Sequence, residues 1–137
     1  MRSEPINVSF INRKIRRTTM QIKSQLIEGV HILFLKGRMD ASSAKELKVK
    51  IQQFIKTREP KVVIDLGEID FIDSSGLGTL VAGYRLVSQE GGDVRLASPT
   101  PQTQSLLELT RMDKLFDIFD HHLKAFESFD KAMPQKI

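Results

Sequence analysis

The 137-residue sequence contains no cysteine, and all of its apolar runs are short. Without cysteine the chain has no disulfide framework, no thiolate nucleophile and no cysteine-based zinc site, which suits a reducing cytosol. No stretch approaches the roughly 20 apolar residues that would span a bilayer. The N-terminus carries basic residues, but no apolar segment follows them as it would in a secretory signal. We therefore expect a cytoplasmic protein that makes no membrane contact.

The net positive charge of the chain resides in the first 19 residues. Five basic side chains there face Glu4 alone, and the remaining 118 residues sum to zero, so the extension accounts for the net charge of +4. No aromatic residue interrupts the basic run at 13–17, so the indication of nucleic-acid binding is weak and we expect no direct nucleic-acid partner. We expect a basic, solvated or partly disordered extension over 1–19, one domain over 20–133 and a tail over 134–137.

The spacing of apolar residues predicts an α/β domain. Strands are expected at 20–27, 30–37, 61–66, 94–97 and 116–119, the last at a sheet edge. Helices are expected from 43 to about 57, from about 77 to 90, from 101 to about 112, and after 120. The order β-β-α-β-α-β-α-β-α predicts a mixed, mostly parallel sheet of four to five strands that begins with an antiparallel pair.

Three of the helix starts carry recognisable capping residues. Ser43-Ala44-Lys45-Glu46 has the pattern of a capping box. Thr100 precedes a proline, which favours the first helical position. Asp120 is placed to cap the last helix. These residues predict where three of the four helices begin.

The stretch FIDSSGLGTL, residues 71–80, has an unusual composition of hydroxyls and glycines, but it fits no catalytic or phosphate-binding motif. A nucleophile elbow requires G-x-S-x-G, and its leading glycine is missing whether Ser74 or Ser75 is central. A P-loop requires lysine where Tyr84 stands. A dinucleotide fingerprint beginning at Gly76 would need a third glycine where Val81 stands.

Acidic and histidine side chains give no stronger indication of chemistry. Four acids crowd the segment around the stretch: Asp65, Glu68, Asp70 and Asp73. They could hold a hard cation, but they lack the regular ligand order of a calcium loop. The three histidines are His31, expected in the core or at a sheet edge, and His121 and His122, expected in a solvated first turn. We expect no catalytic, cofactor-binding or metal-binding residues.

Ser74 itself allows two interpretations that apply to the same residue. Its hydroxyl precedes a helical stripe, where it would cap the free N–H groups of the first turn. Gly76 and Gly78 destabilise a helix by about 1 kcal/mol each relative to alanine, and a simple cap does not need them. Glycine there would keep the surface around Ser74 low, so that another protein could reach the hydroxyl. A helix N-terminus also tolerates a phosphate, so Ser74 could be a phosphorylation switch.

Two segments resemble the bacterial anti-sigma factor antagonists of the STAS type. They are VVIDLGEIDFIDSSGLGTL, with the sequence that follows it to residue 119, and the upstream GRMDASSAKELK. The resemblance extends over about Met20 to Phe129, and D-S-S-G-L-G in this context is highly specific. It implies a mixed sheet with about four helices packed mainly on one side. It also implies a non-enzymatic transcription regulator in stress-response or sporulation signalling. The 1–19 extension has no counterpart in the small members of the family.

The resemblance implies that Ser74 is the phosphoacceptor, with Ser75 as the alternative if the register differs by one. In such systems the unphosphorylated antagonist binds an anti-sigma factor that is itself a GHKL-type serine kinase, and phosphorylation releases it. A PP2C-type phosphatase resets the cycle. The implied contact surface comprises Asp40, Asp73, Ser74, Ser75, Gly76, Leu77 and Tyr84. Related modules that sense a small ligand or nucleotide, or control a non-sigma output, are the alternative.

Overall fold

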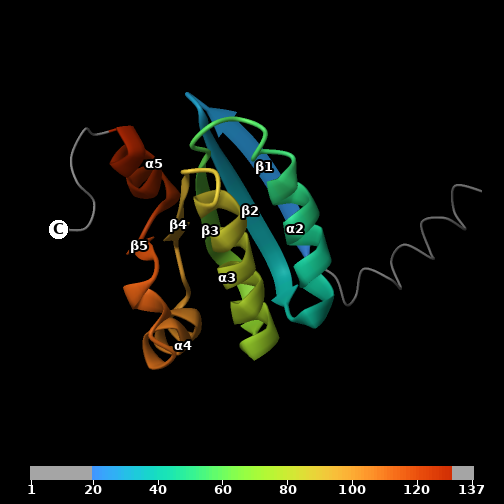
Figure 1. The fold of residues 1–137 in the computed structure, drawn as a ribbon. Coiled ribbons are helices and arrows are strands. Elements are labelled where there is room, and N and C mark those ends of the chain that lie inside the picture. Colours follow the sequence, from blue (N-terminus) through green and yellow to red (C-terminus); the bar gives the residue numbers. More distant parts are fainter. Residues whose placement is uncertain (1–19, 131–137) are drawn as a thin grey trace, which may run out of the picture.

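The computed structural model describes residues 20–130, so the expectations for 1–19 and 134–137 lie outside it. Its sheet has five strands in the order β1-β2-β3-β4-β5 (Figure 1). Their bounds are β1 Gln21–Ile27, β2 Val30–Met39, β3 Lys61–Ile72, β4 Asp93–Ala97 and β5 Asp117–Phe119. The first pair is antiparallel and the other three pairs are parallel. The predicted mixed, mostly parallel sheet is confirmed.

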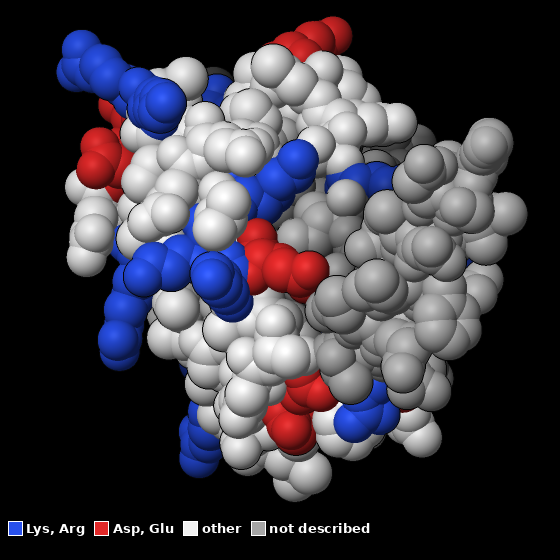
Figure 2. Space-filling view, turned by 90° about the vertical axis from the view of Figure 1, so that its right-hand side faces the viewer, with Lys and Arg blue, Asp and Glu red and all other residues white. Residues whose placement is uncertain are grey.

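Helices cover both faces of this sheet unequally. They are α2 Ala44–Gln52, α3 Ser74–Ser88, α4 Pro101–Leu109 and α5 His122–Asp130, with two short 3-10 turns, η1 Ala41–Ser43 and η2 Met112–Lys114. The first three helices share one core cluster with the sheet, whereas α5 packs in a second cluster on the opposite face. The expected predominance of one face is confirmed. The edge strand β1 and helix α2 form one side of the molecule, drawn in Figure 2.

Alternate residues of the central strands face the two clusters. On β2, Leu33 belongs to the cluster under α2, α3 and α4, and Ile32 to the cluster under α5; both are fully buried. On β3, Ile64 and Val63 divide in the same way. Strands covered on both faces are apolar on both. This double coverage explains the nearly continuous apolar run VHILFL.

Strand β3 extends six residues beyond the predicted 61–66, to Ile72. Its pairing with β4 ends at Asp65, but its pairing with β2 continues to Met39 and Ile72 across two register shifts. The second half, GEIDFI, has mostly exposed side chains, so no buried apolar run marked it in the sequence. As a result β2 and β3 project together beyond β4 and end side by side.

The predicted Ser43–Glu46 capping box is wrong. Ser43 instead belongs to a capping box with Asp40: its Oγ accepts a hydrogen bond from the Asp40 N–H at 3.0 Å and donates to the Arg38 carbonyl at 2.8 Å. Helix α2 begins at Ala44 without a side-chain cap and ends at Gln52, five residues earlier than expected. Asp and Ser are both good N-caps. Asp40 takes this role because it is the first residue after β2, which ends at Met39.

The other two caps had different outcomes. Thr100 caps α4 as predicted, because its Oγ1 accepts from the Thr103 N–H at 3.2 Å. The prediction for Asp120 is wrong: His121 Nδ1 accepts from the Leu123 N–H at 3.0 Å, and Asp120 Oδ1 lies 3.3 Å from Lys124 Nζ. The α5 start is therefore one residue later than the sequence indicated.

Candidate functional site

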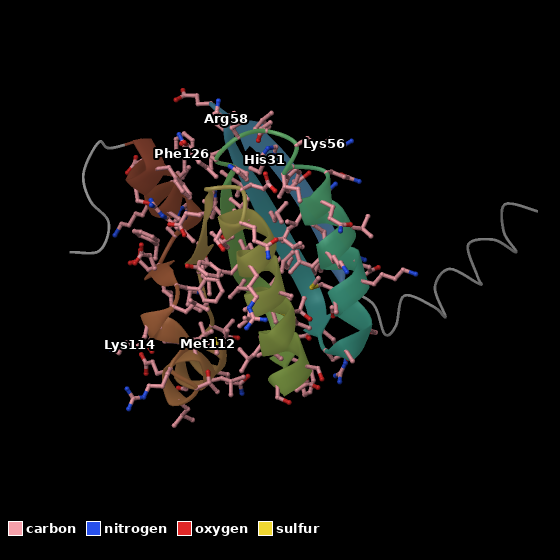
Figure 3. All side chains as sticks on the ribbon, in the orientation of Figure 1. His31, Lys56, Arg58, Met112, Lys114 and Phe126 are labelled. Carbon is pink, nitrogen blue, oxygen red and sulfur yellow. The ribbon has the colours of Figure 1, made fainter. Side chains whose placement is uncertain are left out.

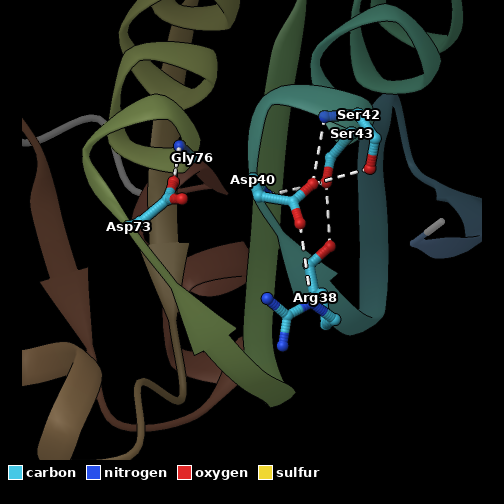
Figure 4. Close-up of polar contacts among 6 residues, drawn as sticks. All are labelled: Arg38, Asp40, Ser42, Ser43, Asp73 and Gly76. Atoms are coloured by element: carbon cyan, nitrogen blue, oxygen red, sulfur yellow. Dashed lines mark hydrogen bonds and ion pairs between the residues drawn. The ribbon is translucent and has the colours of Figure 1, made fainter. Parts of the chain in front are cut away.

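The site lies at the end of the molecule where β2 and β3 finish. In Figure 3, Met112 and Lys114 lie at this end, where α3 begins, whereas His31, Lys56 and Arg58 lie at the other. The Asp73 N–H donates to the Met39 carbonyl at 3.4 Å, which joins the two strand ends. Parallel strands deliver the residues after their carboxyl ends to one edge of a sheet. Asp40 and Asp73 are consequently neighbours at that edge (Figure 4).

Asp73, not Ser74, caps α3. Its backbone is extended, and its Oδ1 accepts from the Gly76 N–H at 3.0 Å. The expectation that the Ser74 hydroxyl caps the helix is therefore wrong. Ser74 is the first helical residue and is exposed, as is Ser75. Within residues 20–130 the Ser74 hydroxyl has no hydrogen-bond partner, so the cap and the candidate phosphoacceptor are separate residues.

The two glycines of the first turns have different roles. Gly76 is buried, and a Cβ there would approach the backbone carbonyl of Met39, at 2.8 Å from its carbon, and the Ile72 side chain at 2.9 Å. Gly76 thus permits α3 to pack directly on the end of β2, and the prediction that it lowers the surface is wrong for this position. Gly78 is exposed, and a Cβ there would meet nothing within 4 Å, which fits an open surface beside Ser74.

Asp40 is hydrogen-bonded and ion-paired to residues close to it in sequence. Its Oδ1 accepts from the Ser42 hydroxyl at 2.6 Å and from the Ser42 N–H at 3.0 Å, and its Oδ2 lies 3.5 Å from Arg38 Nε. The hydrogen bond from the Ser42 hydroxyl is the largest cause of a lowered Asp40 pKa, and the Arg38 charge adds to it. Arg38 also lies over the Phe71 ring, 4.0 Å from its centroid. Sequence reasoning identified Asp40 but missed Arg38 and Ser42.

The remaining predicted contact residues are distributed along α3. Leu77 is buried, with 6% of its surface exposed, and anchors the first turn in the core. Tyr84 is half-buried, and its ring meets Phe116 edge to face with 5.5 Å between centroids. Ten residues of helix separate it from Ser74, which is about 15 Å of rise. The structure thus brings Asp40, Asp73, Ser74, Ser75 and Gly76 together, and places Tyr84 away from them.

The four acids do not crowd one loop as the sequence suggested, because three of them lie within β3. The first, Asp65, accepts from Ser98 Oγ at 2.8 Å and from the Gly67 N–H at 2.9 Å, and its Oδ2 lies 3.4 Å from His122 Nδ1. Across residues 20–130 no group of three or more His, Asp or Glu is arranged to hold a metal ion. Asp65 and Asp73 therefore serve structural contacts of their own, and Glu68 and Asp70 lie exposed on β3.

His31 is also structurally engaged. Its ring stacks on Phe54 with 3.9 Å between centroids, and burial lowers its pKa from the ordinary value of 6.5. It lies at the end of the molecule opposite the start of α3 (Figure 3), where it cannot serve Ser74 as a base. In the part of the chain that the structure describes, no helix is both long and apolar enough to cross a membrane.

Comparison with known proteins places this geometry in a family. The chain is 28% identical over 112 residues to the anti-sigma F factor antagonist of Paenibacillus polymyxa, covering 81% of this chain and 96% of that protein. An anti-sigma factor antagonist from Mycobacterium paratuberculosis shares its fold with a TM-score of 0.72 and 26% identity, over 82% of this chain and 95% of that one.

The phosphorylated form of the Bacillus cell fate determinant SpoIIAA has the same fold at lower identity, 18%, with a TM-score of 0.60 over 80% of this chain and 98% of that one. The STAS domain family model matches residues 21–125, nearly the whole of the described domain. With the five-stranded mixed sheet and the α3 start that follows β3, this match shows that the chain belongs to the STAS domain family.

Proposed function

We propose that this chain is an anti-sigma factor antagonist that acts by partner switching. Unphosphorylated, it binds and sequesters an anti-sigma factor that is also a serine kinase; phosphorylation of Ser74 releases it. The single observation that carries the proposal is the exposed, unengaged Ser74 hydroxyl at the first position of α3, beside a separate cap, Asp73. The Paenibacillus polymyxa relative, named an anti-sigma F factor antagonist, supports the function.

The geometry around Ser74 is compatible with a phosphate. The first N–H groups of a helix have no partner within the helix, and the helix dipole favours negative charge there. Of these groups, the Gly76 N–H already binds Asp73. A phosphate on Ser74 would add about two negative charges at this helix N-terminus, next to the carboxylates of Asp73 and Asp40. The surface presented to a partner would change strongly while the fold stayed the same.

The proposed partners follow the family pattern. They are a GHKL-type serine kinase that phosphorylates Ser74 and a PP2C-type phosphatase that reverses it, in the cytoplasm and without enzymatic activity in this chain itself. The proposed contact surface consists of Asp40, Asp73, Ser74, Ser75, Gly76, Leu77 and Tyr84. Because Leu77 is buried and Tyr84 is half-buried, we expect the five residues at the strand ends to contribute most of the binding energy.

Phosphorylation followed by mass spectrometry tests this function. The full chain, Ser74→Ala and Ser75→Ala are each incubated with the kinase and ATP, and the modified residue is mapped. We expect phosphate on Ser74 in the wild type and in Ser75→Ala, and none in Ser74→Ala. Ser75 is the matched control because it is also exposed and lies in the same turn. Normal phosphorylation of Ser74→Ala would refute the assignment.

A further inference from the structure

The charge of the described domain is unevenly distributed along the chain. Residues 20–61 contain nine basic and four acidic side chains, whereas residues 62–130 contain five basic and twelve acidic ones. The strands lie in the sheet in the order of the sequence, from β1 at one edge to β5 at the other (Figure 1). The difference in charge along the sequence therefore becomes a difference in charge across the molecule. The basic side lies at β1 and α2, and the acidic side lies at α4, β5 and α5.

The basic side chains are concentrated on α2 and the turn after it. Residues 44–61 hold six Lys or Arg and two Glu, a net charge of +4. We define the α2 basic face as the exposed side chains of Lys45, Lys48, Lys56 and Arg58. None of the ion pairs within residues 20–130 involves them. Figure 2 shows basic side chains projecting on this side of the molecule, with a few acidic ones among them.

One end of the α2 basic face, formed by Lys45 and Lys48, lies at the same end of the sheet as the Ser74 site. Helices α2 and α3 pack side by side, so closely that a Cβ on Gly83 would lie 2.7 Å from Ile51 Cδ1. Helix α2 follows directly on the Asp40 turn, and α3 on Asp73, so both start at the same end of the sheet. Lys45 and Lys48 lie in the first turns of α2, and the face continues to Lys56 and Arg58 at the far end (Figure 3).

We propose that the α2 basic face is a second docking surface that engages an acidic surface of the kinase which phosphorylates Ser74. The inference rests on the proposed function and names a property of its partner. Unpaired, exposed charges gathered on one side steer an oppositely charged partner toward that side. Val49, 48% exposed within the face, offers an apolar contact of the kind found in protein interfaces.

The composition of the face favours a protein partner over nucleic acid. Three of its four cations are lysines, which act as point charges without the bidentate grip of arginine on phosphate. No exposed aromatic ring stands among them to stack on a base, since Phe54 is buried. Two copies of this chain could also meet, basic side to acidic side, and self-association is one outcome that the experiment below detects.

The proposed docking gives phosphorylation an electrostatic consequence. A phosphate on Ser74 adds about −1.5 to −2 charges at the end where α2 and α3 both begin. The phosphate charge repels an acidic partner and so opposes its attraction to the α2 basic face. It also adds to the negative charge of Asp40 and Asp73. Release of the phosphorylated form would then depend on salt, because screening weakens the repulsion.

Association kinetics with that kinase, measured by stopped flow or surface plasmon resonance, test the inference. The full chain carries Lys45→Glu with Lys48→Glu, and the matched control carries Arg111→Glu with Lys124→Glu on the acidic side. Both pairs change the net charge by the same amount. We expect the α2 pair to lower the association rate constant about tenfold or more at 50 mM salt and the control about twofold or less. The difference should nearly vanish at 500 mM salt.

Other outcomes would refute the inference while leaving the proposed function untested by them. Equal slowing by both pairs would mean that net charge, and not this face, matters. Unchanged association, with a loss of binding to a 20-base-pair DNA duplex or of self-association in sedimentation velocity, would assign the face to another occupant. Circular dichroism confirms that each variant is folded. Phosphorylation of Ser74 is measured separately by mass spectrometry. Its absence would refute the proposed function, whereas the association rates alone decide whether the α2 basic face is a docking surface.

Discussion

Replacing Gly76 by alanine should destabilise the domain, although alanine is the better helix former. The new Cβ would lie 2.8 Å from the Met39 carbonyl carbon and 2.9 Å from Ile72 Cγ1, and closer still to the Met39 carbonyl oxygen. The Met39 atoms belong to the backbone and cannot rotate away. The start of α3 must therefore move off the end of β2, which weakens the 3.4 Å hydrogen bond from the Asp73 N–H to Met39.

The magnitude follows from opposing effects. Alanine gains about 1 kcal/mol of helix propensity over glycine. Overpacking costs about 1–3 kcal/mol, and disturbing the hydrogen bond at the strand end adds about 1 kcal/mol. We expect a net loss of roughly 1–3 kcal/mol in the free energy of unfolding. A 2 kcal/mol loss would lower Tm by roughly 8 °C in a domain of this size.

Gly78→Ala is the matched control, two residues further along the same helix. A Cβ there meets nothing within 4 Å, so only the propensity acts and we expect a gain of up to about 1 kcal/mol. Urea denaturation followed by circular dichroism measures both free energies of unfolding. Opposite signs for the two variants support the close-packing role of Gly76. If Gly76→Ala is as stable as the wild type, or if both variants lose equally, the reasoning is refuted.

Three further predictions concern the α3 cap, the phosphoacceptor and the partly buried His31. Asp73→Ala should lower the free energy of unfolding by about 1 kcal/mol because it removes a cap, and Ser74→Ala should change it by less than about 0.5 kcal/mol; equal losses in urea denaturation would contradict the division between them. Ser74→Asp should weaken kinase binding in calorimetry while Tm stays nearly constant, and a large fall in Tm would favour a structural role for the hydroxyl. The lowered pKa of His31 means that the unfolded state binds its proton at higher pH than the folded state, so stability should fall as pH drops below 6.5. His31→Phe, which can keep a ring on Phe54, should flatten that fall between pH 7.5 and 5.5, and an unchanged slope would exclude His31 as its source.

The fold was predictable where burial marked the sequence. Strands covered on both faces, such as β2, appear as nearly continuous apolar runs, and α4 begins at the Thr100-Pro101 signal that predicted it. The second half of β3 was missed because most of its side chains are exposed. The local sequence pattern could not show that β2 and β3 extend beyond β4 and stay paired with each other to their carboxyl ends.

The site was predictable in composition but not in its division of roles. Asp73 and Ser74 are both good capping residues one position apart, and only the place where β3 ends decides between them. The need for glycine at position 76 arises from Met39, far away in sequence. The contact of Arg38 with the Phe71 ring had no local signal, since it depends on β2 and β3 meeting, whereas its ion pair with Asp40 lies within one turn of chain.

The separation of the cap from the hydroxyl has a consequence for how such a domain can diverge. Because Asp73 satisfies the helix start, position 74 is released from any structural duty within the described domain. Under the proposed function, a single codon change at 74 would produce a protein that folds and binds normally but no longer responds to its kinase. Regulation could therefore be gained or lost in one evolutionary step, without a compensating change at the helix start.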